Sequence, residues 1–225
     1  MACVNRYFGF AKISEARFRL LLRCFSLDLT ATQTAEMIGL SVRRTNDLFQ
    51  RIRERLAIEC EKVSPFKGEL DADESYFGPR RVRGLRGRGA GRKTIVFGLL
   101  KRGDEVYTEI VPNASKAALQ AVIRHRAKLD SIVHTDKWRG YDGLVDLGYE
   151  KHRGVNHGNH ESALEPNHIN GIESFWSYAN SRLAKFHGVR KQTFPLHLKE
   201  TEFRFNHRGK NLHKVLLSLF RKEPL

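Results

Sequence analysis

The sequence predicts an α/β fold, in which a mixed sheet flanked by helices is preceded by a small all-α domain. Residues 17–56 carry apolar side chains at helical spacing. Residues 69–135 then contain four strand-like segments, with one amphipathic helix before the last of them. Further helical segments follow from about residue 168. This order of elements is expected for a layered α/β domain that follows a helical one.

The all-α domain is expected to span residues 1–62 and to contain a helix-turn-helix. Ala35 precedes Gly39 by four positions, and a small residue followed by glycine lets two helices approach and turn tightly. Ser41 can cap the second helix. That helix is basic, as in DNA-binding motifs of this kind, and its candidate DNA contacts are Arg43, Arg44 and Asn46. An ordinary helical hairpin with a solvated charged face is the alternative.

A linker at residues 61–68, EKVSPFKG, separates this domain from the α/β domain, expected over residues 67–208. The expected strands are 69–77, 93–102, 105–112 and the short buried run 131–135. The expected helices are 115–129, capped by Asn113 or Ser115, and a long one at 168–186. Residues 209–225 are expected to form a C-terminal helical tail.

The loop between the first two strands, residues 78–93, is rich in arginine and glycine and contains no acid. Arginine binds phosphate strongly, and glycine makes the loop adaptable. We expect it to order on a nucleic-acid backbone, although such runs are often only solvated. The candidate contacts are Arg80, Arg81, Arg83, Arg86, Arg88, Arg92 and Lys93.

The whole chain is strongly basic, with a formal net charge of +15 and a pI near 10.0. Such a charge favours a polyanionic partner, above all nucleic acid. None of the three cysteines belongs to a CxxC pair, which argues against a zinc ribbon and a disulfide framework. No signal peptide or membrane-spanning run is evident, so a cytoplasmic, nucleoid-associated protein is expected.

Three carboxylates stand out as candidates for chemistry. Asp73 lies mid-strand, Asp136 ends the interior strand in SIVHTDKWRGY, and Glu173 borders the apolar stripe of the long helix. Asp71 shares a strand face with Asp73. Carboxylates in such places are costly unless they are paired, hydrogen-bonded or metal-bound. Capping or a salt bridge is the plain alternative for Asp73 and Asp136, and a surface ion pair for Glu173.

If the three acids met in space, they would form a cluster of hard oxygen ligands suited to Mg²⁺ or Mn²⁺. Two such ions can stabilise both the attacking and the leaving oxygen of a phosphodiester displacement. Lys137 and Arg139 directly follow Asp136 and are candidate phosphate contacts, with salt bridges as the alternative.

The spacing of the three acids and the sequences of the segments around them resemble the DDE transposases. They resemble in particular one branch of small bacterial insertion-sequence transposases with an N-terminal helix-turn-helix. The matching segments are DADESYFGPRR, GRGAGRKTIVFGLLKR, IVHTDKWRGYD, HINGIESFWSYANSRLAKFHG and ETEFRFNHR. The resemblance implies an RNase H-like fold and a metal-dependent enzyme that cuts at the ends of its own element. It would then join 3′-hydroxyls to target DNA. It also implies double-stranded DNA and a homo-oligomer in the synaptic complex as partners.

In this resemblance Asp73, Asp136 and Glu173 bind two Mg²⁺ or Mn²⁺ ions, with Asn170 as the alternative third residue. Relatives often have a lysine where this chain has Asn180, so the nearby Arg182 and Lys185 are candidate substitutes. Without such a substitute, the chain could be a catalytically weakened or domesticated DNA-binding protein. A generic RNase H-like nuclease without strand transfer is the third possibility.

Overall fold

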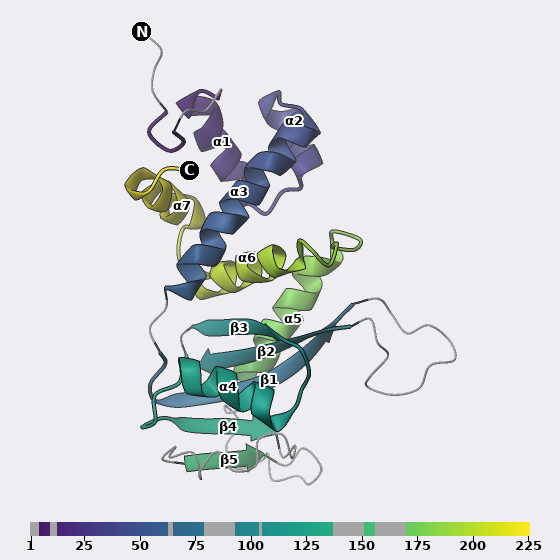
Figure 1. The fold of residues 1–225 in the computed structure, drawn as a ribbon. Helices are drawn as coiled ribbons and strands as arrows, with labels where there is room; N and C mark the ends of the chain where they lie inside the picture. Colours follow the sequence, from purple (N-terminus) through teal and green to yellow (C-terminus); the bar gives the residue numbers. More distant parts are fainter. Residues whose placement is uncertain are drawn as a thin grey trace, which may run out of the picture. The chain divides into compact units, whose positions relative to one another are not determined.

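The computed structural model describes residues 5–9, 13–62, 65–78, 93–103, 105–136, 151–155 and 170–225. For Asp136, Asn170 and residues 151–155 it describes the backbone alone. The chain divides into two compact units, one formed by residues 1–61 with 207–225 and the other by residues 62–206. Each unit can be followed in the ribbon of Figure 1.

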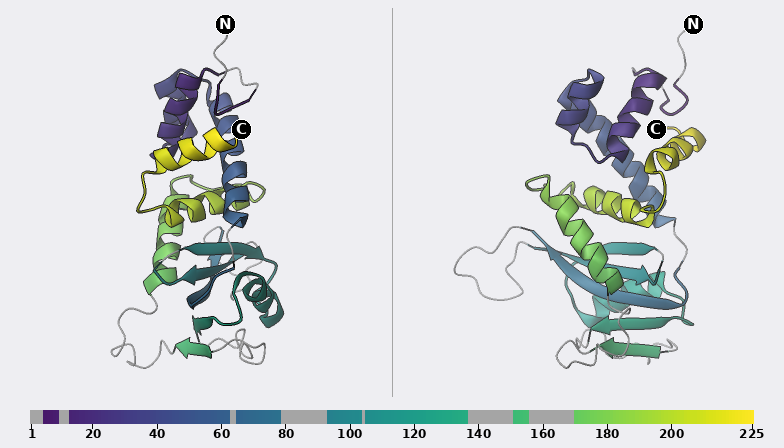
Figure 2. Two further views of the ribbon diagram at one scale, coloured as in Figure 1. Left: turned by 90° about the vertical axis from the view of Figure 1, so that its left-hand side faces the viewer. Right: turned by 180° about the vertical axis from the view of Figure 1, so that it is seen from behind.

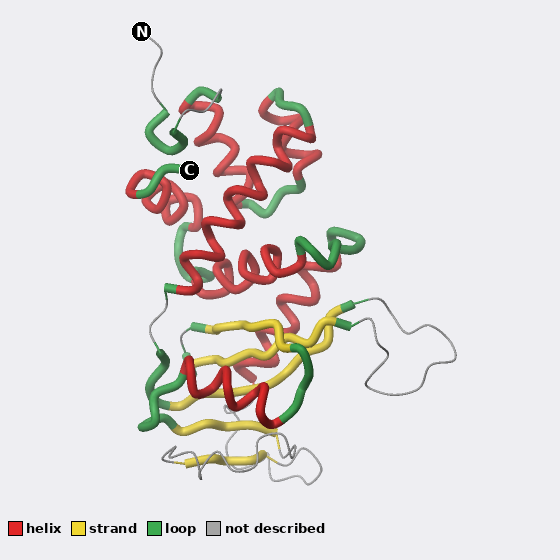
Figure 3. Tube along the Cα trace, viewed as in Figure 1, coloured by secondary structure: helices red, strands yellow, loops and turns green. Residues whose placement is uncertain are grey.

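The described part of the first unit consists of helices, red in Figure 3, joined by loops and turns, which are green. Its helices are α1 (Glu15–Ser26), α2 (Ala31–Ile38), α3 (Val42–Glu61) and α7 (Leu212–Lys222). Thr30 and Gln33 form a reciprocal capping box at the start of α2, and Gly39 ends that helix with φ of 67°. Ser41 Oγ accepts the backbone N–H of Arg44 at 3.2 Å, which confirms the expected cap of α3.

Residues 209–225, which the sequence suggests as a tail, belong instead to the first unit. Leu216 and Phe220 lie one turn apart on α7 and are fully buried. The ring of Phe220 meets that of Phe18 on α1 edge-on, with centroids 6.2 Å apart. The backbone N–H of Leu225 also donates to the carbonyl of Tyr7, and its carbonyl accepts from the N–H of Gly9. Apolar contacts distant in sequence therefore make α7 part of a helical core.

The second unit is built on a five-stranded sheet with strand order β3-β2-β1-β4-β5. The strands are β1 (Glu69–Phe77), β2 (Thr94–Lys101), β3 (Val106–Val111), β4 (Ile132–Asp136) and β5 (Lys151–Val155). The first three are antiparallel, whereas β4 runs parallel to β1 and β5 parallel to β4. This is the expected RNase H-like mixed sheet. The sequence did not predict β5, whose residues KHRGV lack an apolar pattern; its described backbone pairs along all of β4.

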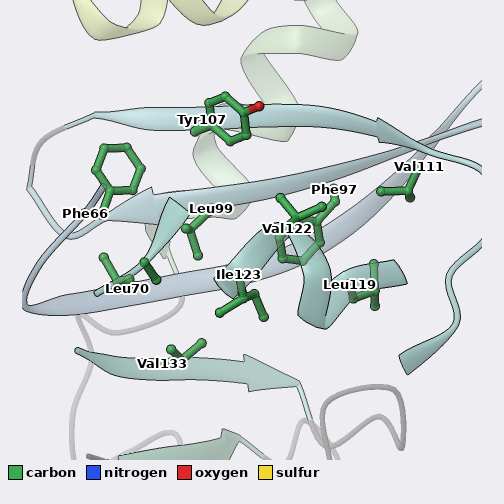
Figure 4. Packing of buried hydrophobic residues seen from close by; sticks show 12 residues of the cluster. Phe66, Leu70, Phe97, Leu99, Tyr107, Val111, Leu119, Val122, Ile123 and Val133 are labelled. Carbon is green, nitrogen blue, oxygen red and sulfur yellow. The ribbon is translucent and has the colours of Figure 1, made fainter. Parts of the chain in front are cut away.

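Helices cover both faces of the sheet. Helix α4 (Lys116–Arg126) packs on one face against a cluster that includes Leu70, Phe97 and Val133 (Figure 4). Helices α5 (Asn170–Ala184) and α6 (Phe194–Asn206) pack with Val96 and Leu100 of the other face. The right-hand view of Figure 2 looks onto this face, with α5 crossing in front of the strands. Because side chains alternate along a strand, Asp71 and Asp73 point to the α5 face.

The edge strand β3 is capped by side chains of α6. Asn206 accepts the backbone N–H of Val106 at 2.8 Å and donates to its carbonyl at 2.9 Å. Glu202 accepts both the backbone N–H and the hydroxyl of Thr108, at 2.8 and 2.6 Å. These bonds satisfy outward backbone groups of Val106 and Thr108, which would otherwise be open to pairing with another strand.

Candidate active site

The register between β1 and β4 brings the first two predicted acids to neighbouring positions. Leu70 pairs with Val133, and Asp71 pairs with His134. Two residues further along each parallel strand lie Asp73 and Asp136. Val133 faces α4, so Asp136, three positions later, belongs to the opposite face, which Asp73 shares. The side chain of Asp136 lies outside the described part of the structure.

The long helix α5 lies directly over Asp73. The indole N–H of Trp176 donates to Oδ2 of Asp73 at 3.0 Å, and the backbone N–H of Glu74 donates to Oδ1 at 2.8 Å. Glu173 is exposed and precedes Trp176 by three residues, which places it about one helical turn from that contact. The third predicted acid thus lies on the element that covers the first.

The start of α5 approaches the sheet closely at Gly171. A Cβ at this position would lie 2.6 Å from Cδ2 of Leu100 and 3.3 Å from Oδ2 of Asp71. Glycine therefore permits the approach that holds the helix, and Glu173 with it, against the aspartate-bearing strand. Asn170, the alternative third residue, is the first residue of α5, and only its backbone is described.

Asp71 has a different environment from Asp73. It is 4% exposed and accepts a hydrogen bond from Nε of Arg102 at 2.9 Å. Arg102 also pairs with Glu69, and Nε2 of His134 lies 3.3 Å from Oε2 of the same glutamate. Asp71 is thus neutralised by a partly buried arginine.

The cations suggested as substitutes near Asn180 differ from each other. Asn180 is exposed on α5, but Arg182 is buried, with Nη2 2.5 Å from Oε1 of Glu200 and Nη1 2.8 Å from Oγ1 of Thr201. The suggestion that Arg182 contacts DNA does not fit this buried ion pair. Lys185 remains a candidate; its amine lies 4.9 Å from the centroid of the Phe186 ring and is partly accessible.

Of the other predicted DNA contacts, some belong to the described part of the structure and the rest lie outside it. Arg43, Arg44 and Asn46 are exposed at the start of α3, and Lys93 is exposed just before β2. Further along α3, the guanidinium of Arg53 lies over the rings of Phe25 and Phe49, and Arg55 pairs with Glu59. The remaining candidates lie outside the described residues: Arg80, Arg81, Arg83, Arg86, Arg88, Arg92, Lys137 and Arg139.

The donor set of the candidate site fits a hard divalent cation. Asp73 and Glu173 offer carboxylate oxygens, and the backbone of Asp136 lies on the strand next to that of Asp73; carboxylate ligands suit Mg²⁺ and Mn²⁺. Among the side chains that the structure describes, no three His, Cys, Asp or Glu residues converge to hold a metal. Asp136 and Asn170, the other predicted ligands, have no described side chain.

Sequence reasoning missed the part played by Trp176. Trp176 lies on the apolar stripe of α5 and is 7% exposed. Nothing in the helical spacing indicates that its indole N–H reaches Asp73. A buried tryptophan usually finds a hydrogen-bond partner for its indole N–H. Because the facing strand offers few polar side chains, these were the signal that could have suggested the partner.

The sheet order, with acids on β1, β4 and the covering helix, defines this unit as an RNase H-like domain. Residues 65–206 match the model of the ISXO2-like transposase domain, and the chain belongs to this family. An uncharacterized transposase-like protein of Haemophilus influenzae is 47% identical over 102 residues, which are 45% of this chain and 81% of that protein.

Solved structures of low identity also resemble the chain. The catalytic core domain of BIV integrase has a TM-score of 0.41 and 14% identity, and the match covers 67% of this chain and 93% of that one. The Mos1 strand transfer complex gives a TM-score of 0.31 and 15% identity, over 93% of this chain and 78% of that one. A Mos1 paired end complex with Mn gives 0.33 and 15%, over 94% and 79%. The described helices include none with the length and apolar run that a membrane span requires.

Proposed function

We propose that the chain binds the ends of its insertion sequence and catalyses metal-dependent strand cleavage and transfer of the 3′-hydroxyl into target DNA. The observation that carries the proposal is the register that aligns Asp73 with Asp136 beneath the helix bearing Glu173. Membership of a transposase family supports the same reaction class.

In this proposal Asp73, Asp136 and Glu173 hold Mg²⁺ or Mn²⁺, with two ions expected. Bound metal would supply activation of the attacking oxygen and stabilisation of the leaving oxygen. The protein's part is to fix the carboxylates: β1 and β4 place two of them on adjacent strands, and α5 holds the third over the same face. Rigid strands and a packed helix suit this task, because small displacements of reacting groups reduce rates strongly.

DNA binding is assigned to the exposed start of α3 and to the basic loop between β1 and β2. Residues at the start of the second helix of a helix-turn-helix contact base edges in the major groove, and Arg43, Arg44 and Asn46 occupy this place. A pair of DNA ends requires two or more copies of the protein, so a homo-oligomer is expected in the synaptic complex. A nucleoid-associated location follows from the same proposal.

The test is a strand-joining assay with purified full-length protein, Mg²⁺ or Mn²⁺, and DNA carrying the repeats that flank the gene. Asp73→Asn, Asp136→Asn and Glu173→Gln should each retain DNA affinity and lose joined products. Asn170→Ala tests the alternative third residue. Joining by the Asp136→Asn variant would contradict the assignment, and cut products without joined ones would indicate a nuclease.

A second candidate is a DNA-binding protein without chemistry. One observation favours it: at Asn180, where the resemblance leads one to expect a lysine, the chain has an exposed asparagine, and Arg182, one of the two suggested substitutes, is buried in an ion pair. The replacement Asn180→Lys separates the two functions. A gain in joining would show that the chemistry is present but weakened, whereas DNA binding with no joining in either protein would support the second candidate.

A further inference from the structure

The side chain of Trp176 is held firmly beside the candidate site. It is 7% exposed, and its ring packs against Phe77 and Phe175, with centroids 6.1 and 5.0 Å away. Its one polar atom, Nε1, donates to Oδ2 of Asp73 at 3.0 Å. The packing of the ring therefore fixes the direction in which this hydrogen bond points.

A glycine on the neighbouring strand makes room for this ring. Gly98 on β2 is the direct register partner of Asp73 on β1. A Cβ at Gly98 would lie 2.6 and 2.9 Å from Cζ2 and Cη2 of Trp176, closer than real atoms approach. Glycine in the interior of a strand is unfavourable in itself and often marks a close approach. Here it lets the indole reach the carboxylate that lies opposite.

The Asp73 carboxylate is thus oriented from two sides. The backbone N–H of Glu74 binds Oδ1 and the indole N–H binds Oδ2, so rotation about the Cβ–Cγ bond would break both hydrogen bonds. Each oxygen of an ionised carboxylate has two acceptor sites, which leaves room for a cation on either oxygen. Donors of this kind orient metal ligands, and their loss typically costs about 10–100-fold in metal affinity or activity.

We propose that Trp176 is a positioning residue that holds the carboxylate of Asp73 in the orientation required to bind a divalent cation. Gly98 leaves the space that the ring of Trp176 occupies. The inference rests on the proposed function, in which Asp73 is a metal ligand. It extends that function by assigning a task to two residues that touch neither DNA nor metal.

The test is Mn²⁺ binding by the full-length protein without DNA. The electron paramagnetic resonance signal of free Mn²⁺ measures how much of the ion remains unbound. Trp176→Phe keeps an aromatic ring and removes the donor, and it should weaken binding about tenfold or more. Gly98→Ala keeps the donor but displaces the ring, and it should change affinity in the same direction. Tyr178→Phe, which also removes a polar group from an aromatic side chain of α5, is the matched control and should bind as the wild type does.

The outcomes separate this inference from the proposed function. If Asp73→Asn binds Mn²⁺ like the wild type, the metal assignment itself is overturned. If Asp73→Asn loses binding but Trp176→Phe, with an unchanged thermal midpoint, does not, only the role of Trp176 is overturned. If Trp176→Phe fails to fold, Gly98→Ala decides, and an unchanged affinity overturns the inference. High Mn²⁺ should restore strand joining by Trp176→Phe, whereas a deficit that persists at saturation would contradict a role in metal binding.

Discussion

Arg182 on α5 and Glu200 on α6 form a buried ion pair, with side chains that are 3% and 1% exposed. The same Oε1 of Glu200 accepts a hydrogen bond from Nε of Arg204 at 2.8 Å, so one carboxylate joins two arginines. The pair connects the helix that bears Glu173 to the helix that covers the edge of the sheet. Its place in the fold explains why Arg182 is a structural residue.

Replacement of either Arg182 or Glu200 by alanine should destabilise the second unit. Arg182→Ala is expected to lower the free energy of unfolding by about 3 kcal/mol, at the low end for a broken buried pair because Arg204 still compensates Glu200. Glu200→Ala should cost more, since it leaves two buried arginines without their shared carboxylate. Urea unfolding followed by circular dichroism measures both. Lys185→Ala on the same helix is the control, with a change below about 1 kcal/mol. Equal costs for all three would contradict the ion-pair role.

Asp71 and Asp73 share a strand face but should respond differently to replacement by asparagine. Asp71→Asn leaves Arg102 facing a neutral amide in a buried place, so the free energy of unfolding should fall by about 1–3 kcal/mol while Mn²⁺ binding persists. Asp73→Asn should have little effect on unfolding and abolish Mn²⁺ binding. Thermal unfolding and Mn²⁺ titration on the two variants measure the contrast. The reverse pattern would make Asp71 the metal ligand.

The elements that the sequence predicts well are those whose own residues determine them. The strand-like segments of β1–β3, the cap at Ser41 and the apolar stripe of α5 are local patterns, and the structure has each of them. The strand β5 carries no such pattern, because its pairing with β4 depends on backbone hydrogen bonds that any sequence can make.

The same contrast holds within the candidate site. Asp73, Asp136 and Glu173 could be named from strand position, helix face and resemblance. The burial of Arg182 depends on Glu200 on another helix, and the bond from Trp176 to Asp73 depends on Gly98 on a third element. Helical spacing alone makes an arginine look exposed and a tryptophan look purely apolar. Contacts among three elements are therefore the part that sequence patterns do not contain.

The exposed arginines at the start of α3 predict a salt-dependent affinity for DNA. In the Arg43→Gln, Arg44→Gln double variant, the plot of log K against log salt should become less steep by up to about 2, because each lost phosphate contact removes roughly 0.9 from the slope. Fluorescence anisotropy with duplex DNA at several salt concentrations measures it. Arg124→Gln, an exposed arginine on α4, is the control and should leave the slope close to that of the wild type. An unchanged slope and affinity in the double variant would remove α3 from the DNA interface.

The buried carboxylate of Glu202 predicts a pH dependence of stability. Burial raises the pKa of Glu202 above its ordinary value of 4.5, opposed in part by Lys199 and by the donors of Thr108. The folded state therefore binds the proton more tightly than the unfolded state. Between about 4.5 and the raised pKa, the free energy of unfolding should fall as pH increases.

Glu202→Gln keeps the acceptor oxygen for Thr108 and cannot titrate, so it should lack this part of the pH dependence. Relative to the wild type, the variant should gain stability as pH rises from 4.5 towards the raised pKa of Glu202. Urea unfolding at a series of pH values measures the difference between the two proteins. A constant difference over the whole series would mean that Glu202 has the same proton affinity in the folded and unfolded states, against the effect of its burial between α6 and β3.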